Sequence, residues 1–131
     1  MSLTTVKKLF DRQDYRAVLN YFKSKTTRNR DERNLIAMSL FQIGDTDKAV
    51  EMLNALIIDE PNYWGYANNL GIIYLRKQNY SSALKMLQQA LKLQHPTSES
   101  ETILLNIGSA YGQMGDLERA FEVWASIEGP K

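Results

Sequence analysis

The chain has 131 residues, 44% of them hydrophobic, which is enough for one compact domain with a continuous apolar core. It has no cysteine, which excludes disulfide frameworks, thiolate metal sites and cysteine nucleophiles and suggests a reducing compartment. No apolar run approaches the roughly 18 residues that a membrane helix needs. We therefore expect a soluble protein without a membrane partner, which is either cytoplasmic or has had a signal removed.

The formal net charge of +1 hides an uneven distribution. Residues 1–30 hold eight basic and two acidic residues, whereas residues 98–131 hold two basic and six acidic ones. The run KSKTTRNR at residues 23–30 carries four cations, which could neutralise phosphates. No aromatic residues interleave with these cations, so a solvated connecting loop is the favoured interpretation and nucleic acid is disfavoured as a partner.

Apolar side chains at helical spacing predict eight helices arranged in pairs, and no strand pattern competes with them. From the first helix to the eighth, the marker residues are Leu3, Val6 and Phe10; Tyr15, Val18, Leu19 and Phe22; Ile36, Leu40 and Ile43; Val50, Leu53 and Ile57; Leu70, Ile73 and Tyr74; Leu84, Leu87 and Leu91; Leu104, Ile107 and Tyr111; and Phe121, Trp124 and Ile127. Breaks lie at KSKTTRNR, Pro61-Asn62 and His95-Pro96. Ser98 and Glu101 have the spacing of a capping box, which places the start of the seventh helix near Ser98.

The pairs repeat along the chain. Ala37 and Gly71 are 34 residues apart, and Gly71 and Gly108 are 37 apart. Val6 precedes Ala37 by 31 residues, which adds an earlier and more degenerate copy. The sequence therefore predicts one domain over residues 1–131, divided into a degenerate hairpin (1–29) and three repeats (30–63, 64–97 and 101–131).

Turn residues share this register. Asp14, Asp45, Asn79 and Asp116 fall at one repeat position and are predicted to cap the second helix of each pair. Gly44 and Gly115 precede two of them, where the first helix must end in a left-handed conformation.

Small residues recur inside the predicted helices. A glycine in a helix interior costs about 1 kcal/mol relative to alanine. The recurrence of Gly71 and Gly108 therefore predicts that the two helices of a pair touch there, against Ala83 and Ala120.

These residues resemble the tetratricopeptide repeat signature. Leu70, Gly71, Tyr74, Tyr80, Ala83, Leu87, Ala90 and Pro96 carry the likeness in one repeat, and Gly108, Tyr111, Gly115, Ala120 and Trp124 carry it in the next. Ala37, Gly44, Ala49 and Pro61 match more loosely. The resemblance implies an all-α fold, a right-handed superhelical α-α solenoid of about eight antiparallel helices. Its first helices would line a concave groove that binds a peptide or a segment of another protein.

Carrying the family's groove positions onto this chain gives a set of candidate peptide-binding residues. They are Asn34, Met38, Phe41, Gln42, Asn68, Asn69, Ile72, Leu75, Arg76, Leu105, Asn106, Ser109 and Gln113. Asn69 and Asn106 share one position, and their carboxamides are expected to bond the ligand's backbone amides, because a carboxamide both donates and accepts hydrogen bonds. Their side chains could instead be solvated or cap a neighbouring turn. The cations that clamp a terminal carboxylate in chaperone-binding members are absent here, which excludes that sub-family.

Beyond the eighth helix the sequence predicts no polar capping helix, so Leu117, Phe121 and Trp124 are candidates for an oligomer face. His95 is the single histidine and is expected to be an ordinary loop residue. We expect no catalytic residues, no bound metal and no cofactor. The function predicted is a non-enzymatic adaptor, scaffold or co-chaperone; the alternatives are a homo-oligomer or assembly subunit and, third, a nucleic-acid-associated repeat.

Overall fold

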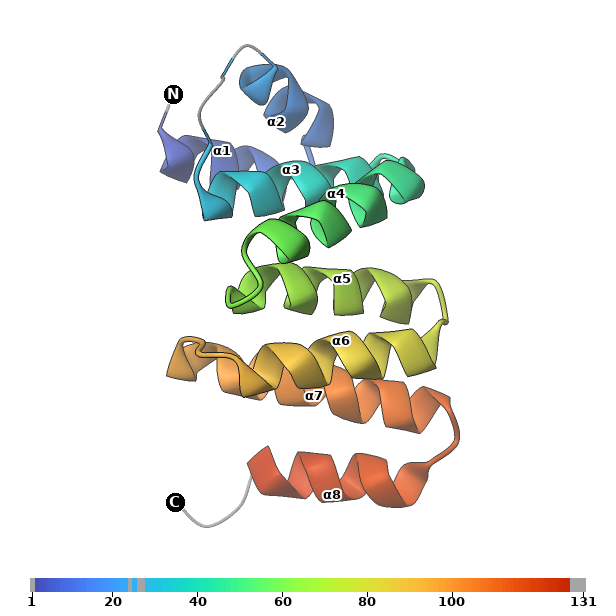
Figure 1. Ribbon diagram of the computed structural model, residues 1–131. Coiled ribbons are helices and arrows are strands. Elements are labelled where there is room, and N and C mark those ends of the chain that lie inside the picture. The colour runs from blue at the N-terminus through green and yellow to red at the C-terminus, as the bar shows by residue number, and fades with distance from the viewer. Residues whose placement is uncertain (1, 24, 26–27, 128–131) are drawn as a thin grey trace. The chain divides into compact units, whose positions relative to one another are not determined.

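The computed structural model describes residues 2–23, 25 and 28–127, and within them it contains eight α-helices and no strand (Figure 1). The helices are α1 (Leu3–Asp11), α2 (Tyr15–Phe22), α3 (Arg30–Gln42), α4 (Thr46–Asp59), α5 (Trp64–Arg76), α6 (Tyr80–Lys92), α7 (Thr97–Gln113) and α8 (Leu117–Ile127). All eight predicted helices are confirmed. No helix in the described ranges combines the length and the apolar character needed to cross a membrane.

The chain divides into two compact units, residues 1–55 and residues 56–131, and the division falls within α4. In the first unit α1 packs against α2, and both pack against α3. Val6, Val18 and Phe22 form its buried cluster, with Leu35 and Ile36 packed beside them. The prediction that residues 1–131 form a single domain stays a prediction.

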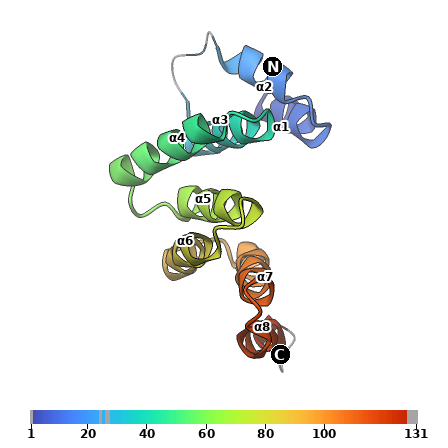
Figure 2. The same ribbon diagram turned by 90° about the vertical axis from the view of Figure 1, so that its right-hand side faces the viewer.

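In the second unit each helix packs against the next, from α5 to α8 (Figure 2). The helix α5 also contacts α7. The core between them consists of small and branched apolar side chains, namely Ala67, Leu84, Leu87, Ala90, Ile103, Ile107 and Ala110.

The turn between paired helices has the same hydrogen bonds in all four hairpins. In the turn from α5 to α6, the Asn79 N–H donates to the Tyr74 carbonyl (2.9 Å) and the Gln78 N–H to the Leu75 carbonyl (3.0 Å). This is the Schellman pattern, which satisfies the last carbonyls of the first helix. The equivalent donors are Gln13 and Asp14, Gly44 and Asp45, and Gly115 and Asp116. The last residue of each turn directly precedes the next helix. The same short motif therefore ends the first helix of a pair and begins the second.

The left-handed conformation in these turns is confirmed at Gly44 (φ 94°) and Gly115 (φ 86°). Gln13 (φ 65°) and Gln78 (φ 64°) adopt it too, although side chains disfavour it by about 1–2 kcal/mol. The turn geometry is therefore kept in every hairpin, whether or not glycine is present.

The predicted caps are confirmed at Asp14 and Asp116, whose carboxylates accept from the N–H groups of Ala17 (3.4 Å) and Arg119 (3.3 Å). Asn79 precedes α6 as predicted, but its side chain makes no capping bond.

The predicted capping box at Ser98 is wrong. The helix α7 begins at Thr97 with Pro96 at the N-cap, and no side chain caps it. Instead, the Glu99 N–H donates to the Pro96 carbonyl (2.9 Å). Ser98 consequently lies inside the first turn, where its hydroxyl cannot act as the N-cap.

The repeat register is confirmed by burial. Its small packing positions are all fully buried, at Val6, Val18, Ala37, Ala49, Ala83 and Ala120. Paired helices approach closely at Gly71 and Gly108: a methyl group at Gly71 would lie 2.7 Å from Leu87 Cγ, and one at Gly108 would lie 2.2 Å from Trp124 Nε1. Each glycine therefore makes room for a large side chain from the partner helix, so its nearest neighbour is Leu87 or Trp124 rather than the predicted Ala83 or Ala120.

Two glycines of α7 provide a matched test of this packing. We expect Gly108→Ala to destabilise the protein by about 1–3 kcal/mol, because the methyl group overlaps the Trp124 ring. At Gly112 a methyl group would meet Trp124 only at 3.6 Å, an ordinary contact, so Gly112→Ala should stabilise by up to about 1 kcal/mol through helix propensity. Urea unfolding measures both, and equal effects of the two substitutions would contradict the packing role of Gly108.

Candidate functional site

The predicted groove positions of the second unit lie on α5 and α7, two helices that contact each other. Asn69 and Asn106 occupy the same repeat position and are both half-buried. Ile72, Leu75 and Ser109 are also half-buried, and Leu75 packs against the core of the unit. The predicted positions that are exposed are Arg76, Leu105 and Gln113.

Two predicted groove residues are buried rather than on the surface. Asn68 is 7% exposed and Met38 is 9% exposed. Each directly follows a fully packed alanine, Ala67 or Ala37, and a helical neighbour of such a position lies at the edge of the core. Asn68 Oδ1 has no hydrogen-bond partner among the described residues.

The remaining predicted groove residues of the first unit, Asn34, Phe41 and Gln42, are half-buried on α3. A groove that runs through all three repeats stays a prediction.

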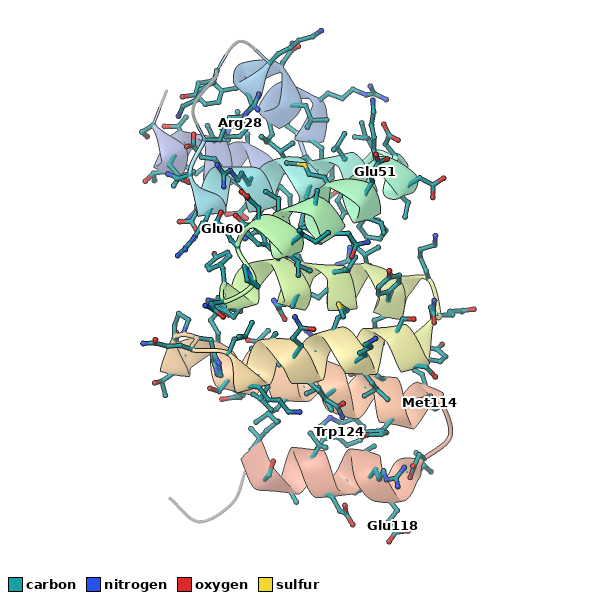
Figure 3. All side chains as sticks on the ribbon, in the orientation of Figure 1. Arg28, Glu51, Glu60, Met114, Glu118 and Trp124 are labelled. Carbon is teal, nitrogen blue, oxygen red and sulfur yellow. The ribbon has the colours of Figure 1, made fainter. Side chains whose placement is uncertain are left out.

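The predicted oligomer face at α8 is exposed in part. Leu117 is 55% exposed and Phe121 is 61% exposed. Trp124, labelled in Figure 3, is half-buried because its indole covers Gly108 between α7 and α8. Its ring contacts that of Phe121 edge to face, with centroids 5.7 Å apart. The large apolar side chains that this helix exposes are therefore Leu117 and Phe121.

The basic run before α3 is not a simple solvated loop. Arg28 Nη2 donates to the Phe22 carbonyl (2.7 Å), and Lys25 pairs with Glu32, whose side chain is only 6% exposed. The Lys25 ammonium also lies near the rings of Tyr21 and Phe22. Two of the four cations thus stabilise the fold, which removes charge that a nucleic acid would need. Ser24, Thr26 and Thr27 lie outside the described residues.

Glu32 belongs to a capping box that was not predicted from the sequence. The Asn29 side chain accepts from the Glu32 N–H (2.9 Å), and the Asn29 N–H donates to Glu32 Oε1 (3.0 Å). The hydrogen bond from Lys25, followed by that from the Asn29 N–H, lowers the pKa of Glu32 below 4.5, and the same pair raises the pKa of Lys25. The capping box could have been predicted from the sequence, because Glu32 follows Asn29 by three residues.

His95 anchors the loop before α7. Its Nδ1 lies 2.8 Å from the Leu93 carbonyl oxygen, and its Nε2 lies 2.7 Å from Ser100 Oγ. Its ring also faces that of Trp64, with centroids 6.3 Å apart. Among the described residues, no group of three or more histidine, aspartate or glutamate side chains is placed to hold a metal ion.

A surface groove of about 590 Å³ that the sequence did not reveal lies along α6, the end of α7 and the start of α8. We call it the α6–α8 groove. Its lining residues are Ser81, Leu84, Lys85, Gln88, Gln89, Lys92, Leu93, Tyr111, Met114 and Arg119. Met114 lies at the end of α7, beside the turn into α8 (Figure 3). None of the predicted groove residues lines it.

A second groove, of about 560 Å³, lies in the first unit. We call it the α2–α4 groove. Its lining residues are Arg16, Leu19, Asn20, Lys23, Leu40 and Lys48.

Comparison with known proteins agrees with this architecture of helical hairpins. Residues 65–123 match one family profile described as tetratricopeptide repeat, and residues 35–63 match a second with the same description. Together the two ranges cover more than half of the chain. The chain is a helical-repeat protein, and it belongs to the tetratricopeptide repeat family.

Two curated relatives are the BBSome complex member BBS4 of Bos taurus and that of Mus musculus. Each is 27% identical over 94 residues, which is 72% of this chain and 17% of the relative. The chain thus spans 17% of the length of the curated relatives it matches.

Solved structures of MamA share the fold. One has a TM-score of 0.67 at 20% identity and covers 95% of this chain and 71% of that chain. A MamA variant has a TM-score of 0.69 at 18% identity and covers 92% of this chain and 70% of that chain. These likenesses confirm the all-α solenoid fold class. Membership of the tetratricopeptide repeat family supports, in general terms, a protein-protein interaction module.

The contacts of Glu32 with Lys25 and Asn29 give a pH-dependent prediction. Glu32→Ala should cost about 1–2 kcal/mol at neutral pH, because Lys25 and the Asn29 N–H lose their acceptor. Since folding lowers the pKa of Glu32, its contribution is complete above pH 4.5 and is lost as the pH falls through the folded-state pKa. Urea unfolding should therefore show wild type and variant converging in acid.

The control is Asp31→Ala, which removes the neighbouring carboxylate. Asp31 is exposed and lies 3.9 Å from the exposed Lys7, so the loss should stay below about 1 kcal/mol. A loss of stability in Glu32→Ala no larger than that in Asp31→Ala would contradict the stabilising role of the Glu32 contacts with Lys25 and Asn29.

Proposed function

We propose that this module binds an extended segment of another protein along the first helices of its hairpins. Asn69 and Asn106 bond the backbone amides of that segment, and Phe41, Ile72 and Leu75 contact its apolar side chains. The role is that of a non-enzymatic adaptor, scaffold or co-chaperone.

The observation that carries the proposal is the pairing of Asn69 with Asn106. They occupy one repeat position on two helices that contact each other, and both side chains are partly accessible. Two carboxamides at the spacing of a repeat suit a ligand that is itself a repeating chain of amides. Ile72 and Ser109, one turn further along each helix, also repeat one position.

The comparisons support a binding role at the level of the family. The curated relatives are members of a complex, the BBSome, and the ranges that match the family profiles contain all five of these residues. We propose that the chain likewise works within a protein assembly, with no catalytic step and no cofactor.

The double variant Asn69→Ala, Asn106→Ala tests this proposal. A partner isolated with the wild-type protein from native lysate and then purified should bind the variant more than about tenfold more weakly, because its amides lose two bonding groups. Isothermal titration calorimetry measures the change.

The matched control is Asn54→Ala with Asn62→Ala, two exposed asparagines outside the predicted groove. This control should bind with wild-type affinity. If the groove variant also bound with unchanged affinity, the proposal would be wrong.

A second candidate function is self-association through α8. The observation that favours it is the exposure of Leu117 (55%) and Phe121 (61%) on one helix. Contiguous apolar surface of this kind marks interaction sites in proteins.

If α8 is an oligomer face, Phe121→Glu should convert an oligomer into a monomer, because a charge there would be buried without a partner. Multi-angle light scattering over a range of concentrations measures the mass. Glu122→Gln, at the neighbouring exposed position, serves as the control and should leave the mass unchanged. A monomeric wild-type protein at high concentration would exclude this candidate.

A further inference from the structure

We propose that the α6–α8 groove and the α2–α4 groove are two copies of one docking site for acidic amphipathic segments of a partner protein. This site is separate from the predicted groove on α5 and α7. It is made by the second helix of one hairpin together with the turn region of the next.

The α6–α8 groove combines an apolar floor with a basic rim. Leu84, Leu93 and Met114 supply apolar surface, and Met114 is 47% exposed. Lys85 and Lys92 are exposed, and neither forms an ion pair with another described residue. Among the described residues that line the groove, none is acidic.

Three of the other polar side chains of this groove are held in place. Arg119 pairs with Asp116 (3.2 Å) and lies over the Tyr111 ring, 5.9 Å from its centroid. Gln88 Nε2 donates to the Tyr111 hydroxyl (3.4 Å). The wall formed by Tyr111 is therefore ordered by its neighbours, while the two lysines remain available to a ligand.

The α2–α4 groove has the same composition. Leu19 and Leu40 supply the apolar surface, and Arg16, Lys23 and Lys48 supply three cations. Lys48 lies 4.0 Å from Asp45, which repeats the pair between Arg119 and Asp116. No acidic residue appears among its described lining residues either.

The two grooves are equivalent in the repeat register. All six residues of the α2–α4 groove have counterparts that line the α6–α8 groove, 65 residues later for those on α2 and its C-cap and 71 later for those on α3 and α4. The matched pairs are Arg16 with Ser81, Leu19 with Leu84, Asn20 with Lys85, Lys23 with Gln88, Leu40 with Tyr111, and Lys48 with Arg119.

Only one position carries a cation in both grooves, Lys48 in the α2–α4 groove and Arg119 in the α6–α8 groove. Each groove nonetheless holds three cations without an acidic lining residue. The charge is thus retained while the individual positions differ, which points to a common ligand chemistry. Carboxylates of the ligand would meet the cations, and its apolar side chains would meet the leucines.

The apolar floor favours a protein segment over a nucleic acid. A phosphate backbone has no apolar group to place against Leu84 and Leu93. Base stacking would need an open aromatic face, whereas the Tyr111 ring already faces Arg119. An amphipathic helix with acidic and apolar residues on one face satisfies both parts of the groove.

The test uses a fluorescein-labelled helical peptide with leucines at i, i+3, i+4 and i+7 flanked by glutamates. In fluorescence anisotropy the wild-type protein should bind it at two sites, and binding should weaken as salt rises from roughly 0.05 M to 0.5 M. Lys85→Glu with Lys92→Glu should remove one site, lowering that site's affinity by at least about tenfold. Arg16→Glu with Lys23→Glu should remove the other.

The matched control is Lys8→Glu with Lys77→Glu, which changes the net charge equally at exposed positions outside both grooves. It should keep both sites, and circular dichroism verifies that every variant is folded. The Asn69→Ala, Asn106→Ala variant should also keep both sites, which separates this proposal from the function proposed above.

Three results would overturn the proposal. Equal weakening by the control would reduce the effect to net charge, and equal binding of a peptide with glutamines in place of glutamates would remove the role of the cations. Tighter binding of an oligothymidylate that depends on the same lysines would assign the grooves to nucleic acid.

Discussion

The close approach of paired helices at glycine is the contact on which the second unit depends. Gly71 lies under Leu87 and Gly108 lies under Trp124, at distances where no side chain could be accommodated without displacing its neighbour. Because a helix interior otherwise disfavours glycine, the packing of the large partner side chain must offset that cost. These two contacts bring α5 close to α6 and α7 close to α8.

The turns between paired helices have the same geometry in every hairpin along the chain. Each hairpin reverses direction through the same pair of backbone hydrogen bonds, with one residue in the left-handed conformation. Gln78 adopts that conformation although glycine would do so at lower cost. The tertiary contacts of α5 with α6 therefore outweigh a local preference of about 1–2 kcal/mol.

Two kinds of surface arise from one repeated hairpin. The first helices present carboxamides and apolar side chains at Asn69, Asn106 and Ile72, while the second helices and the following turns form the two basic grooves. In the basic run before α3, by contrast, Lys25 and Arg28 are engaged with Glu32 and the Phe22 carbonyl. Cations that have an acceptor nearby, such as Lys25 and Arg28, thus stabilise the fold, whereas cations without one among the described residues, such as Lys85 and Lys92, remain available to a ligand.

The sequence by itself determined the eight helices, the repeat register and the two glycine positions at which paired helices touch, because apolar periodicity and small residues at equal spacing can be read along the chain. It missed the capping box of Asn29 and Glu32 and misplaced one at Ser98, since that helix already begins at Thr97 with Pro96 at the N-cap. Only the tertiary structure decided that Asn68 and Met38 are buried, that Trp124 covers Gly108, and that Lys85 and Arg119 line one groove. Burial and grooves depend on residues that are distant in the chain and meet only after the hairpins pack, so no spacing within one helix could have revealed them.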